Sequence, residues 1–298
     1  MENTYTSLED GSMNKWGLFL FAGWAIVTLA VFLATVAGAL AEAYLSVSGN
    51  STQVIQAIVT SGIVLPMVIY LYKRLYQQSE QPEVPAFAFT QTPHFLTGFL
   101  FAVVLAIAGL YIMSMSGLID SIQWQAVTTW LGALLVNLLI AFFYEALPEE
   151  LIMRGFIFDV LRHKLSVWQT VLAQAFIFLA FSFGITFLQV IVGMASTDSL
   201  ILLTPELILH FFFAIALALM RVWTGSIWAA VGFHLGYLMI ARFLLMPDIG
   251  ESPAVLTFQD NITQGAGASL TIMIVILGTI ILMLILNGIK KKLKKREI

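Results

Sequence analysis

Four charged residues follow closely on a long uncharged stretch in the middle of the chain. No charged residue occurs between positions 126 and 144, and then Glu145, Glu149, Glu150 and Arg154 occur within ten positions. A carboxylate held in a water-filled cavity within a membrane can act as a general base towards a water molecule. Glu150 and Arg154 stand four residues apart, so on a helix they share a face and can form an ion pair. Glu149 points about 100° away from Glu150, so the two carboxylates need not have the same role.

Pro148 is expected to control how this cluster is presented. A proline ends or kinks a helix and is favoured in the first turn of a new one. Glu149 and Glu150 would then lie in that first turn, where free backbone N–H groups stabilise carboxylates. Two interpretations stay open: the cluster either lines a polar cavity or belongs to an interfacial helix over 148–164 whose apolar residues face the acyl chains. Those apolar residues are Phe156, Ile157, Val160 and Leu161.

The composition of the chain indicates the environment in which this cluster must work. Of 298 residues, 60% are hydrophobic and 10% are charged, whereas a soluble domain carries about 25% charged residues. Much of the surface must therefore face lipid, which predicts an integral membrane protein. The net charge of -3 provides no general basic footprint for nucleic acid. The lack of cysteine excludes disulfides, thiolate metal ligands and a cysteine nucleophile.

Apolar runs predict eight transmembrane helices, because roughly 20 apolar residues are needed to cross the hydrocarbon core of a membrane. The runs lie near 16–44, 52–72, 94–115, 126–147, 166–194, 203–222, 226–246 and 268–289. We therefore predict an all-α polytopic membrane protein that forms a single integral membrane domain over residues 1–298.

The distribution of Lys and Arg predicts the orientation of these helices. Basic residues precede the first run and follow the second, fourth, sixth and eighth runs, and they end in the segment 290–296. The loops 45–51, 116–125, 195–202 and 247–267 contain none. Because Lys and Arg are retained on the cytoplasmic side, we expect both termini to be cytoplasmic, in the cytoplasmic membrane of a bacterium. Arg242 lies inside a run, and we expect its side chain to snorkel to the outer interface or to pair with a loop carboxylate.

Three segments resemble the motifs of a known family of membrane proteases. Glu-Glu-Leu-Ile-Met-Arg-Gly at 149–155 is similar to the EExxxR signature of the CPBP family, also called Abi or type II CAAX prenyl endopeptidase-like proteases. The segment 223–234, in which Gly-Ser-Ile-Trp leads to His234, resembles a later motif of that family. Phe183-Gly184 resembles the start of its middle FxxxH motif. Order and spacing agree over 126–246, which we take as the CPBP-like core.

The resemblance implies a glutamate-dependent endopeptidase that hydrolyses peptide bonds of membrane-anchored or lipidated substrates. It implies that Glu149 is the general base and that Glu150 is a supporting carboxylate. It implies further that Arg154 orients Glu150 and that His234 donates a hydrogen bond to the oxyanion. The expected partners are membrane lipids and a membrane-anchored peptide or membrane protein, with no nucleic acid.

Two positions depart from the family pattern. Phe187 stands four residues beyond Phe183, where the middle motif has His, and Leu238 stands four residues beyond His234, where the family has Asn or Asp. Neither side chain can relay a proton or donate a hydrogen bond. A second interpretation is therefore a catalytically degenerate relative that binds a partner through the same cavity, in a scaffold, regulatory or immunity role. A transporter or channel places polar residues at mid-membrane depth in several helices. Asn137, Gln174 and Arg242 are too few to support that function.

His210 is the candidate to replace the missing histidine. It lies in the neighbouring run, one turn after Glu206, and its side chain either reaches the space expected for that histidine or packs near an ordinary helix start. The four histidines, His94, His163, His210 and His234, stand singly and form no HExxH motif. Nothing in this spacing specifies zinc, so we predict no cofactor and leave a metal open.

Overall fold

The computed structural model describes residues 16–76, 91–246, 253–261 and 265–294. Within those residues, eight helices are long and apolar enough to cross a membrane. They are α2 (Trp16–Leu45), α3 (Asn50–Tyr76), α4 (Pro93–Met115), the helix Val127–Arg162, α8 (Val167–Ile191), α10 (Thr204–Thr224), the helix Ile227–Leu245 and α12 (Ala266–Lys294). Each predicted run lies largely within one of these helices, and the predicted all-α polytopic membrane fold is confirmed.

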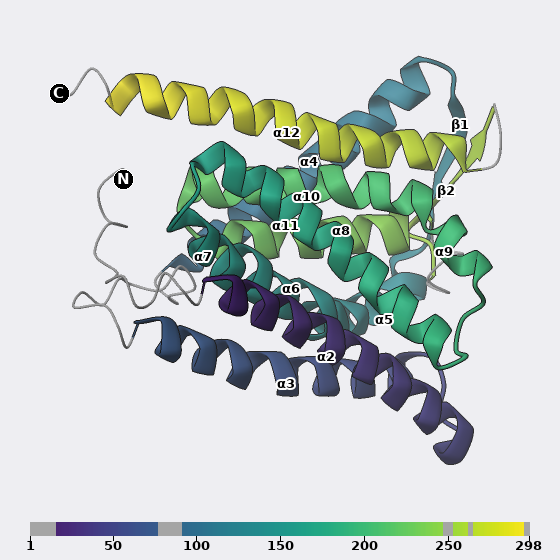
Figure 1. Cartoon of the computed structure of the whole chain (residues 1–298). Coiled ribbons are helices and arrows are strands. Elements are labelled where there is room, and N and C mark those ends of the chain that lie inside the picture. The colour runs from purple at the N-terminus through teal and green to yellow at the C-terminus, as the bar shows by residue number, and fades with distance from the viewer. Residues whose placement is uncertain (1–15, 77–90, 247–252, 262–264, 295–298) are drawn as a thin grey trace.

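Helix α11 (Ile227–Ile240), which continues as the π-helical segment η4 (Ala241–Leu245), lies in the centre of the bundle (Figure 1). All residues of α11 except Tyr237 are buried. It packs against α4, α10 and the helix 127–162. α2 and α3 pack together at one edge of the bundle, and α12 covers α4 and α10 at the opposite edge. This arrangement carries His234, in the middle of α11, into the protein interior.

Two glycines allow α4 and α11 to touch through their backbones. At Gly98 of α4 an added Cβ atom would overlap the carbonyl oxygen of Ala229, and at Gly232 of α11 it would overlap the carbonyl oxygen of Phe95. Any side chain at either position would push the two helices apart. The two glycines therefore fix the position of α11 relative to α4.

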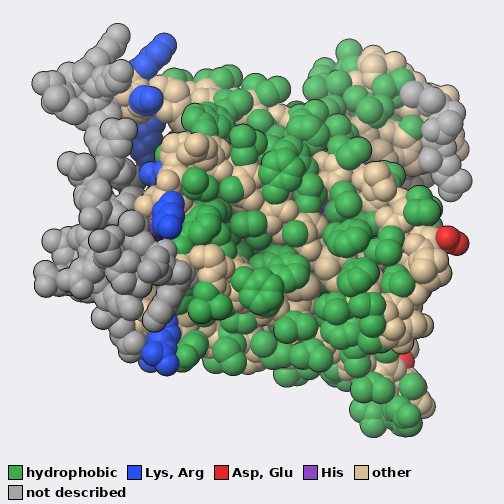
Figure 2. All heavy atoms as spheres, in the orientation of Figure 1, with side chains coloured by type: hydrophobic (Ala, Val, Ile, Leu, Met, Phe, Trp, Pro, Cys, Tyr) green, Lys and Arg blue, Asp and Glu red, His purple; other side chains and the backbone are tan. Residues whose placement is uncertain are grey.

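Figure 2 shows Lys and Arg side chains gathered at one end of the bundle and Asp and Glu side chains at the other, with hydrophobic side chains between them. We call the first end the basic end; α2 begins and α12 ends there. Its described residues include Lys73, Arg74, Arg162, Lys164 and Lys290. An apolar surface between two polar ends is the surface expected of a protein that spans a membrane.

A short two-stranded antiparallel ribbon lies at the end opposite the basic end (Figure 1). It pairs β1 (Ile119–Trp124) with β2 (Leu256–Asp260), and a short helix, α9 (Asp198–Leu202), joins α8 to α10. Asp260 Oδ1 accepts a hydrogen bond at 2.9 Å from the backbone N–H of Gly267, in the first turn of α12. The sequence predicted only loops here, and the ribbon forms because the two loops emerge at the same end of the bundle.

The helix 127–162 is continuous through Pro148. It consists of α5 (Val127–Ala141), η2 (Phe142–Ala146), α6 (Leu147–Glu150), η3 (Leu151–Ile157) and α7 (Phe158–Arg162), of which η2 and η3 are π-helical. A proline lacks an N–H group and its ring clashes with the preceding turn of an α-helix. The wider π-helical turn η2, which ends two residues before Pro148, accommodates the ring without ending the helix. The prediction that Pro148 begins a new helix is therefore wrong.

The segment after Pro148 is buried in the bundle. Phe156, Ile157, Val160 and Leu161 are each at most 2% exposed. Phe156 packs edge-to-face against Tyr72 of α3, with ring centroids 5.4 Å apart. The alternative of an interfacial helix over 148–164 is therefore wrong, because its apolar side chains pack against protein and not against acyl chains.

Candidate active site

One carboxylate oxygen joins two helices in the interior of the bundle. Glu150 Oε1 accepts a hydrogen bond from Arg154 Nη1 at 3.0 Å and lies 3.0 Å from His234 Nδ1. Glu150 and Arg154 are 0% exposed, and His234 is 4% exposed. A buried charge is tolerated only when it is paired and hydrogen-bonded. The three side chains therefore form one polar network between the helix 127–162 and α11.

Arg154 also lies over the ring of Phe178 of α8, with Cζ 4.8 Å from the ring centroid. Such a cation–π contact stabilises a guanidinium group that has been removed from water. Among the described residues, no hydrogen-bond partner reaches Arg154 Nε, Arg154 Nη2 or Glu150 Oε2. The two nitrogens carry three N–H donors and the oxygen is an acceptor, and a polar ligand can use all of them.

Glu149 has different surroundings from Glu150. The residue is 8% exposed, and its carboxylate makes no hydrogen bond to any residue that the structure describes. It interacts electrostatically with the carboxylates of Glu145 and Glu150 and with the guanidinium groups of Arg154 and Arg242. Of the two adjacent carboxylates, Glu150 is held in an ion pair, and Glu149 is the one that is available to a water molecule.

The contact with Glu150 determines how the His234 ring can act. The ion pair with Arg154 requires an ionised Glu150, and an ionised carboxylate only accepts hydrogen bonds. Nδ1 of His234 therefore carries the proton that faces Glu150. Nε2 then accepts a hydrogen bond in the neutral ring and donates one in the imidazolium form. Phe213 packs edge-to-face on the imidazole, with ring centroids 5.0 Å apart, and limits its rotation.

The two positions that depart from the family pattern have different surroundings in the structure. Phe187 is 45% exposed and stacks on Phe183, with ring centroids 6.0 Å apart, so it lies on the outward face of α8. The inward face of α8 instead presents Gln174 and Ser182, which are 0% and 9% exposed. Phe187 therefore does not occupy the candidate site. Leu238 is 9% exposed and lies on α11 one turn after His234.

His210 of α10 lies next to the polar network, on the other side of Phe178. The His210 and Phe178 rings meet edge-to-face with centroids 5.9 Å apart, and Phe178 also contacts Arg154. His210 Nδ1 is buried and makes no hydrogen bond to a described residue. No contact between His210 and Glu206 occurs within the described chain, because Glu206 is exposed at the start of α10. His210 therefore has a polar atom directed into the interior near the site.

Arg242 forms a second polar contact between the same two helices, further from the basic end. Its Nη2 donates to Glu145 Oε1 in a short ion pair, and its Nη1 donates to Asn137 Oδ1 at 3.2 Å. The two charged side chains are 24% and 21% exposed. The expectation that Arg242 snorkels to the interface or pairs with a loop residue is therefore wrong, because the paired carboxylate is carried by a neighbouring membrane helix.

A third polar contact lies closer to the basic end. Arg221 donates through Nη2 to Asp159 Oδ1 at 3.2 Å and through Nε to the carbonyl oxygen of Arg154 at 3.2 Å. The Tyr72 hydroxyl donates to Asp159 Oδ2 at 2.9 Å. The sequence placed Arg221 only among the residues that set topology, and Asp159 was not singled out. The available signal in the sequence was a single aspartate, Asp159, in an apolar stretch, because an unpaired carboxylate is unfavourable there.

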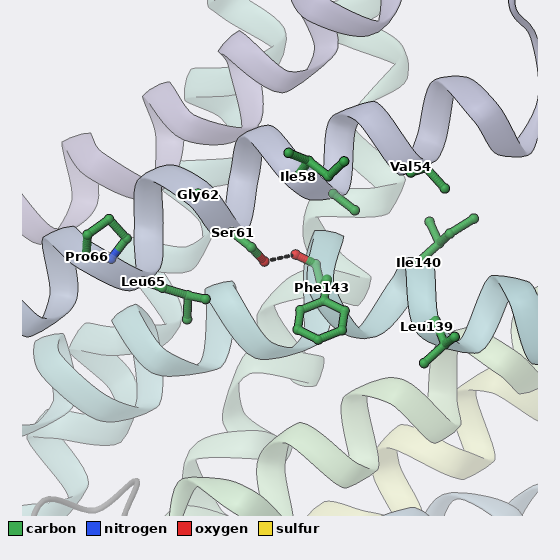
Figure 3. Close-up of a pocket in the computed structure, with 10 residues that line it drawn as sticks. Val54, Ile58, Ser61, Gly62, Leu65, Pro66, Leu139, Ile140 and Phe143 are labelled. Carbon is green, nitrogen blue, oxygen red and sulfur yellow. Dashed lines mark hydrogen bonds between the residues drawn. The ribbon is translucent and has the colours of Figure 1, made fainter.

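An apolar cavity of about 480 Å³ lies between α3 and the helix 127–162 (Figure 3). Ile58 and Gly62 of α3 line one side, and Leu139 and Phe143 of the helix 127–162 line the other. The Ser61 hydroxyl donates to the carbonyl oxygen of Phe143 at this boundary, as Figure 3 shows. The lining offers almost exclusively hydrocarbon, so the cavity suits an apolar chain.

The structure brings the four predicted site residues into one region. Glu150, Arg154 and His234 are in direct contact, and Glu149 is the neighbouring residue on the same helix. Within the described part of the chain, no group of three or more His, Asp or Glu side chains is arranged to hold a metal ion. The catalytic roles of the four residues stay predictions.

Comparison with known proteins supports the motifs found in the sequence. The family model described as type II CAAX prenyl endopeptidase Rce1-like matches residues 130–240. This stretch contains Glu149, Glu150, Arg154 and His234 and lies within the predicted core. No curated protein and no solved structure matches the chain. Over residues 130–240, this chain is therefore similar to the family described as type II CAAX prenyl endopeptidase Rce1-like, in agreement with the resemblance of its motifs.

Proposed function

We propose that this protein is an intramembrane endopeptidase in which Glu149 activates a water molecule for attack on a peptide bond. The observation that carries the proposal is the contrast between the two adjacent carboxylates. Glu150 is held at 3.0 Å by Arg154 and lies 3.0 Å from His234, whereas Glu149 makes no hydrogen bond within the described chain. A general base needs an unengaged lone pair beside groups that stabilise charge.

The proposed reaction has two steps. Glu149 removes a proton from water as the water oxygen forms a bond to the carbonyl carbon, and the electrons of the C=O double bond move to the oxygen. The protonated His234 ring donates from Nε2 to this oxyanion, while its Nδ1–H stays on Glu150. When the tetrahedral intermediate collapses, the C–N bond breaks and Glu149 gives its proton to the leaving amine.

Glu150 and Arg154 act in this proposal by positioning His234. A ring nitrogen that is held by a buried carboxylate keeps the other ring nitrogen directed at the reacting group. Phe187, which stands where the family motif has a histidine, faces outward. In this proposal His210, which contacts Phe178 beside the polar network, takes the place of that histidine.

The proposed substrate is a peptide anchored in the membrane or modified with a lipid. The family described as type II CAAX prenyl endopeptidase Rce1-like supports this substrate class, and the apolar cavity at Phe143 supports it further. Phe143 precedes Glu149 by six residues, or about 9 Å along a helix axis. A hydrocarbon chain in the cavity would therefore lie close to the cleavage site. The remaining proposed partners are the membrane lipids around the bundle.

The orientation of the protein forms part of the proposal. Lys and Arg side chains gather at the basic end, and such residues are retained in the cytoplasm during insertion. Both termini are then cytoplasmic, in the cytoplasmic membrane of a bacterium. Glu149, Glu150 and Arg154 follow one another towards that side along the helix 127–162.

The proposal is tested with purified protein in lipid nanodiscs and two peptides that share one sequence. One peptide carries a farnesyl-cysteine near its C-terminus, and the other is anchored by an apolar transmembrane segment. New peptide termini are identified by mass spectrometry for wild type, Glu149→Gln and His234→Ala, with Glu42→Gln as a control at an exposed carboxylate of α2. Cleavage by wild type and Glu42→Gln that disappears in Glu149→Gln supports the proposal. Equal cleavage by wild type and Glu149→Gln contradicts it.

A second candidate function is a binding protein without catalytic activity. It is favoured by Leu238, which is buried one turn after His234 and offers no hydrogen bond, and by the inward face of α8, which presents Gln174 and Ser182 and no histidine. This candidate predicts that wild type cleaves neither peptide, whereas wild type and Glu149→Gln retain the same membrane peptide with equal affinity. Fluorescence anisotropy of a labelled peptide in nanodiscs measures that affinity.

A further inference from the structure

His234, Leu238 and Arg242 form one stripe along α11 and its extension η4. They are spaced four residues apart, so their side chains lie on the same face of the helix. Glu145 and Glu149 have the same spacing on the helix 127–162. Arg242 pairs with Glu145 and His234 contacts Glu150, so α11 with its extension and the helix 127–162 face each other over this stretch.

Helix geometry places the Arg242 side chain over the turn that contains Leu238. Side chains of a helix lean towards its N-terminus, so a long side chain covers the surface above the turn that precedes its own Cα atom. Four residues correspond to about 6 Å along the helix axis, a distance that an arginine side chain spans. Arg242 therefore brings its guanidinium group to the region beside Leu238, where α11 itself provides no polar side chain.

The guanidinium group is anchored and still has free donors. Nη2 is engaged by Glu145 and Nη1 by Asn137, but a guanidinium group has five N–H donors. The Arg242 side chain is 24% exposed, in contrast with the fully buried Arg154. Glu149 interacts electrostatically with Arg242. A fixed cationic donor thus lies close to the proposed general base and is accessible to a ligand.

Both members of this ion pair stand in π-helical turns. Glu145 lies in η2 (Phe142–Ala146) and Arg242 lies in η4 (Ala241–Leu245). A π-helical turn is rare and occurs frequently at functional sites, because its extra residue rotates the following side chains. η2 also accommodates the ring of Pro148. The two turns have in common that each carries a charged side chain that meets the other across the helix boundary.

We propose that Arg242 is a substrate-binding residue that donates a hydrogen bond to the carbonyl oxygen of the scissile peptide bond and replaces the donor that Leu238 lacks. This inference rests on the proposed endopeptidase function. As water attacks the carbonyl carbon and Glu149 takes its proton, negative charge develops on the carbonyl oxygen. His234 and Arg242 stand two turns apart on one helical stripe and approach that oxygen from either side of Leu238, and their N–H groups stabilise the charge.

The test combines cleavage with the binding of two inhibitors that share one peptide sequence. A phosphinic peptide carries a tetrahedral, negatively charged centre like the intermediate, and a ketomethylene peptide resembles the uncleaved substrate. Arg242→Gln should lower kcat about 100-fold to 1000-fold and weaken the phosphinic peptide by a similar factor. Binding of the ketomethylene peptide should change little, because the lost interaction belongs to the transition state.

Three further variants separate substrate binding from support of the fold. Leu238→Asn added to Arg242→Gln should recover activity by about tenfold or more, because it restores a donor on the same stripe. Arg242→Lys keeps the charge beside Glu145 but lacks the forked donor geometry, so it should stay folded and lose activity. Glu145→Gln breaks the same ion pair and keeps the guanidinium group, so it should lose less activity than Arg242→Gln.

Each outcome decides the inference. Equal loss of affinity for both inhibitors in Arg242→Gln, or equal loss of activity in Glu145→Gln and Arg242→Gln, would show a structural role and overturn it. Cleavage at the same rate by wild type and Arg242→Gln overturns this inference alone. A wild-type protein that neither cleaves the peptide nor binds either inhibitor overturns the proposed function, and this inference with it.

Discussion

Glu150 Oε1 lies 3.0 Å from His234 Nδ1, although the two residues are 84 positions apart in the chain. The same oxygen accepts a hydrogen bond from Arg154 of its own helix at 3.0 Å. One atom thus connects the ion pair of Glu150 and Arg154 on the helix 127–162 to α11, the central helix of the bundle. The contact orients the imidazole and couples the integrity of the site to the packing of α11.

Removal of the negative charge from this network should destabilise the fold strongly. Glu150→Gln leaves the Arg154 guanidinium buried without its counter-charge, which typically costs about 3–5 kcal/mol. Thermal and denaturant unfolding in mild detergent measure this loss. The double variant Glu150→Gln/Arg154→Met removes both charges and should recover part of the stability. A single variant as stable as wild type would contradict the assignment of a buried ion pair.

Replacement of Gly232 should prevent close packing of α4 against α11. An added Cβ atom at this position overlaps the carbonyl oxygen of Phe95, so Gly232→Ala should cost about 3 kcal/mol or more. Gly132→Ala is the matched control, since nothing lies within 4 Å of a Cβ atom there. The yield of monodisperse protein and the midpoint of thermal unfolding check both variants. If the two substitutions behave alike, the backbone contact is not required.

The sequence predicted those parts of the fold that depend only on the length and apolar content of a single helix. Length and apolar content placed the eight membrane helices, because a span in lipid must be long and nearly free of charge. The path through Pro148 was missed, because proline disfavours a continuing helix locally, and only the π-helical turn before it removes the clash. Whether such a turn forms depends on packing against other helices, which no local pattern reports.

The candidate site was predicted in part for the same reason. Glu149, Glu150, Arg154 and His234 were found because they stand out in apolar segments and match a family pattern. The partner of Arg242 was not found, because Glu145 lies 97 positions away and spacing along one helix carries no information about it. The outward position of Phe187 also escaped, although Gln174 and Ser182 mark the inward face of α8 at helical spacing.

Filling the apolar cavity should impair cleavage of the lipid-modified peptide selectively. Gly62 lines the cavity, and nothing lies within 4 Å of an added Cβ atom there. The first atom of a side chain at this position therefore meets no neighbour, and Gly62→Leu places hydrocarbon in the space proposed for a lipid chain. We expect kcat/KM for the farnesylated peptide to fall about tenfold or more, with a smaller effect on the transmembrane-anchored peptide. Gly132→Leu serves as the control, and equal losses for both peptides would refute a lipid-binding role.

Substitution of His210 should test its proposed role as the second imidazole. His210→Phe preserves the aromatic contact with Phe178 but removes the buried Nδ1. We expect kcat to fall about 100-fold, because an imidazole beside the general base assists its proton transfer, with little change in unfolding temperature. His94→Phe, at the start of α4, provides the control. Wild-type cleavage rates in His210→Phe would identify His210 as a packing residue.

The close approach of α4 and α11 also has a consequence for how a membrane-embedded peptide can reach the interior. Gly98 and Gly232 place backbone against backbone, so lateral entry between these helices would require them to separate along that contact. The boundary between α3 and the helix 127–162 is different, because side chains and the cavity at Gly62 form it. Of these two boundaries, the one beside α3 therefore offers the easier path for a peptide that diffuses in the bilayer plane.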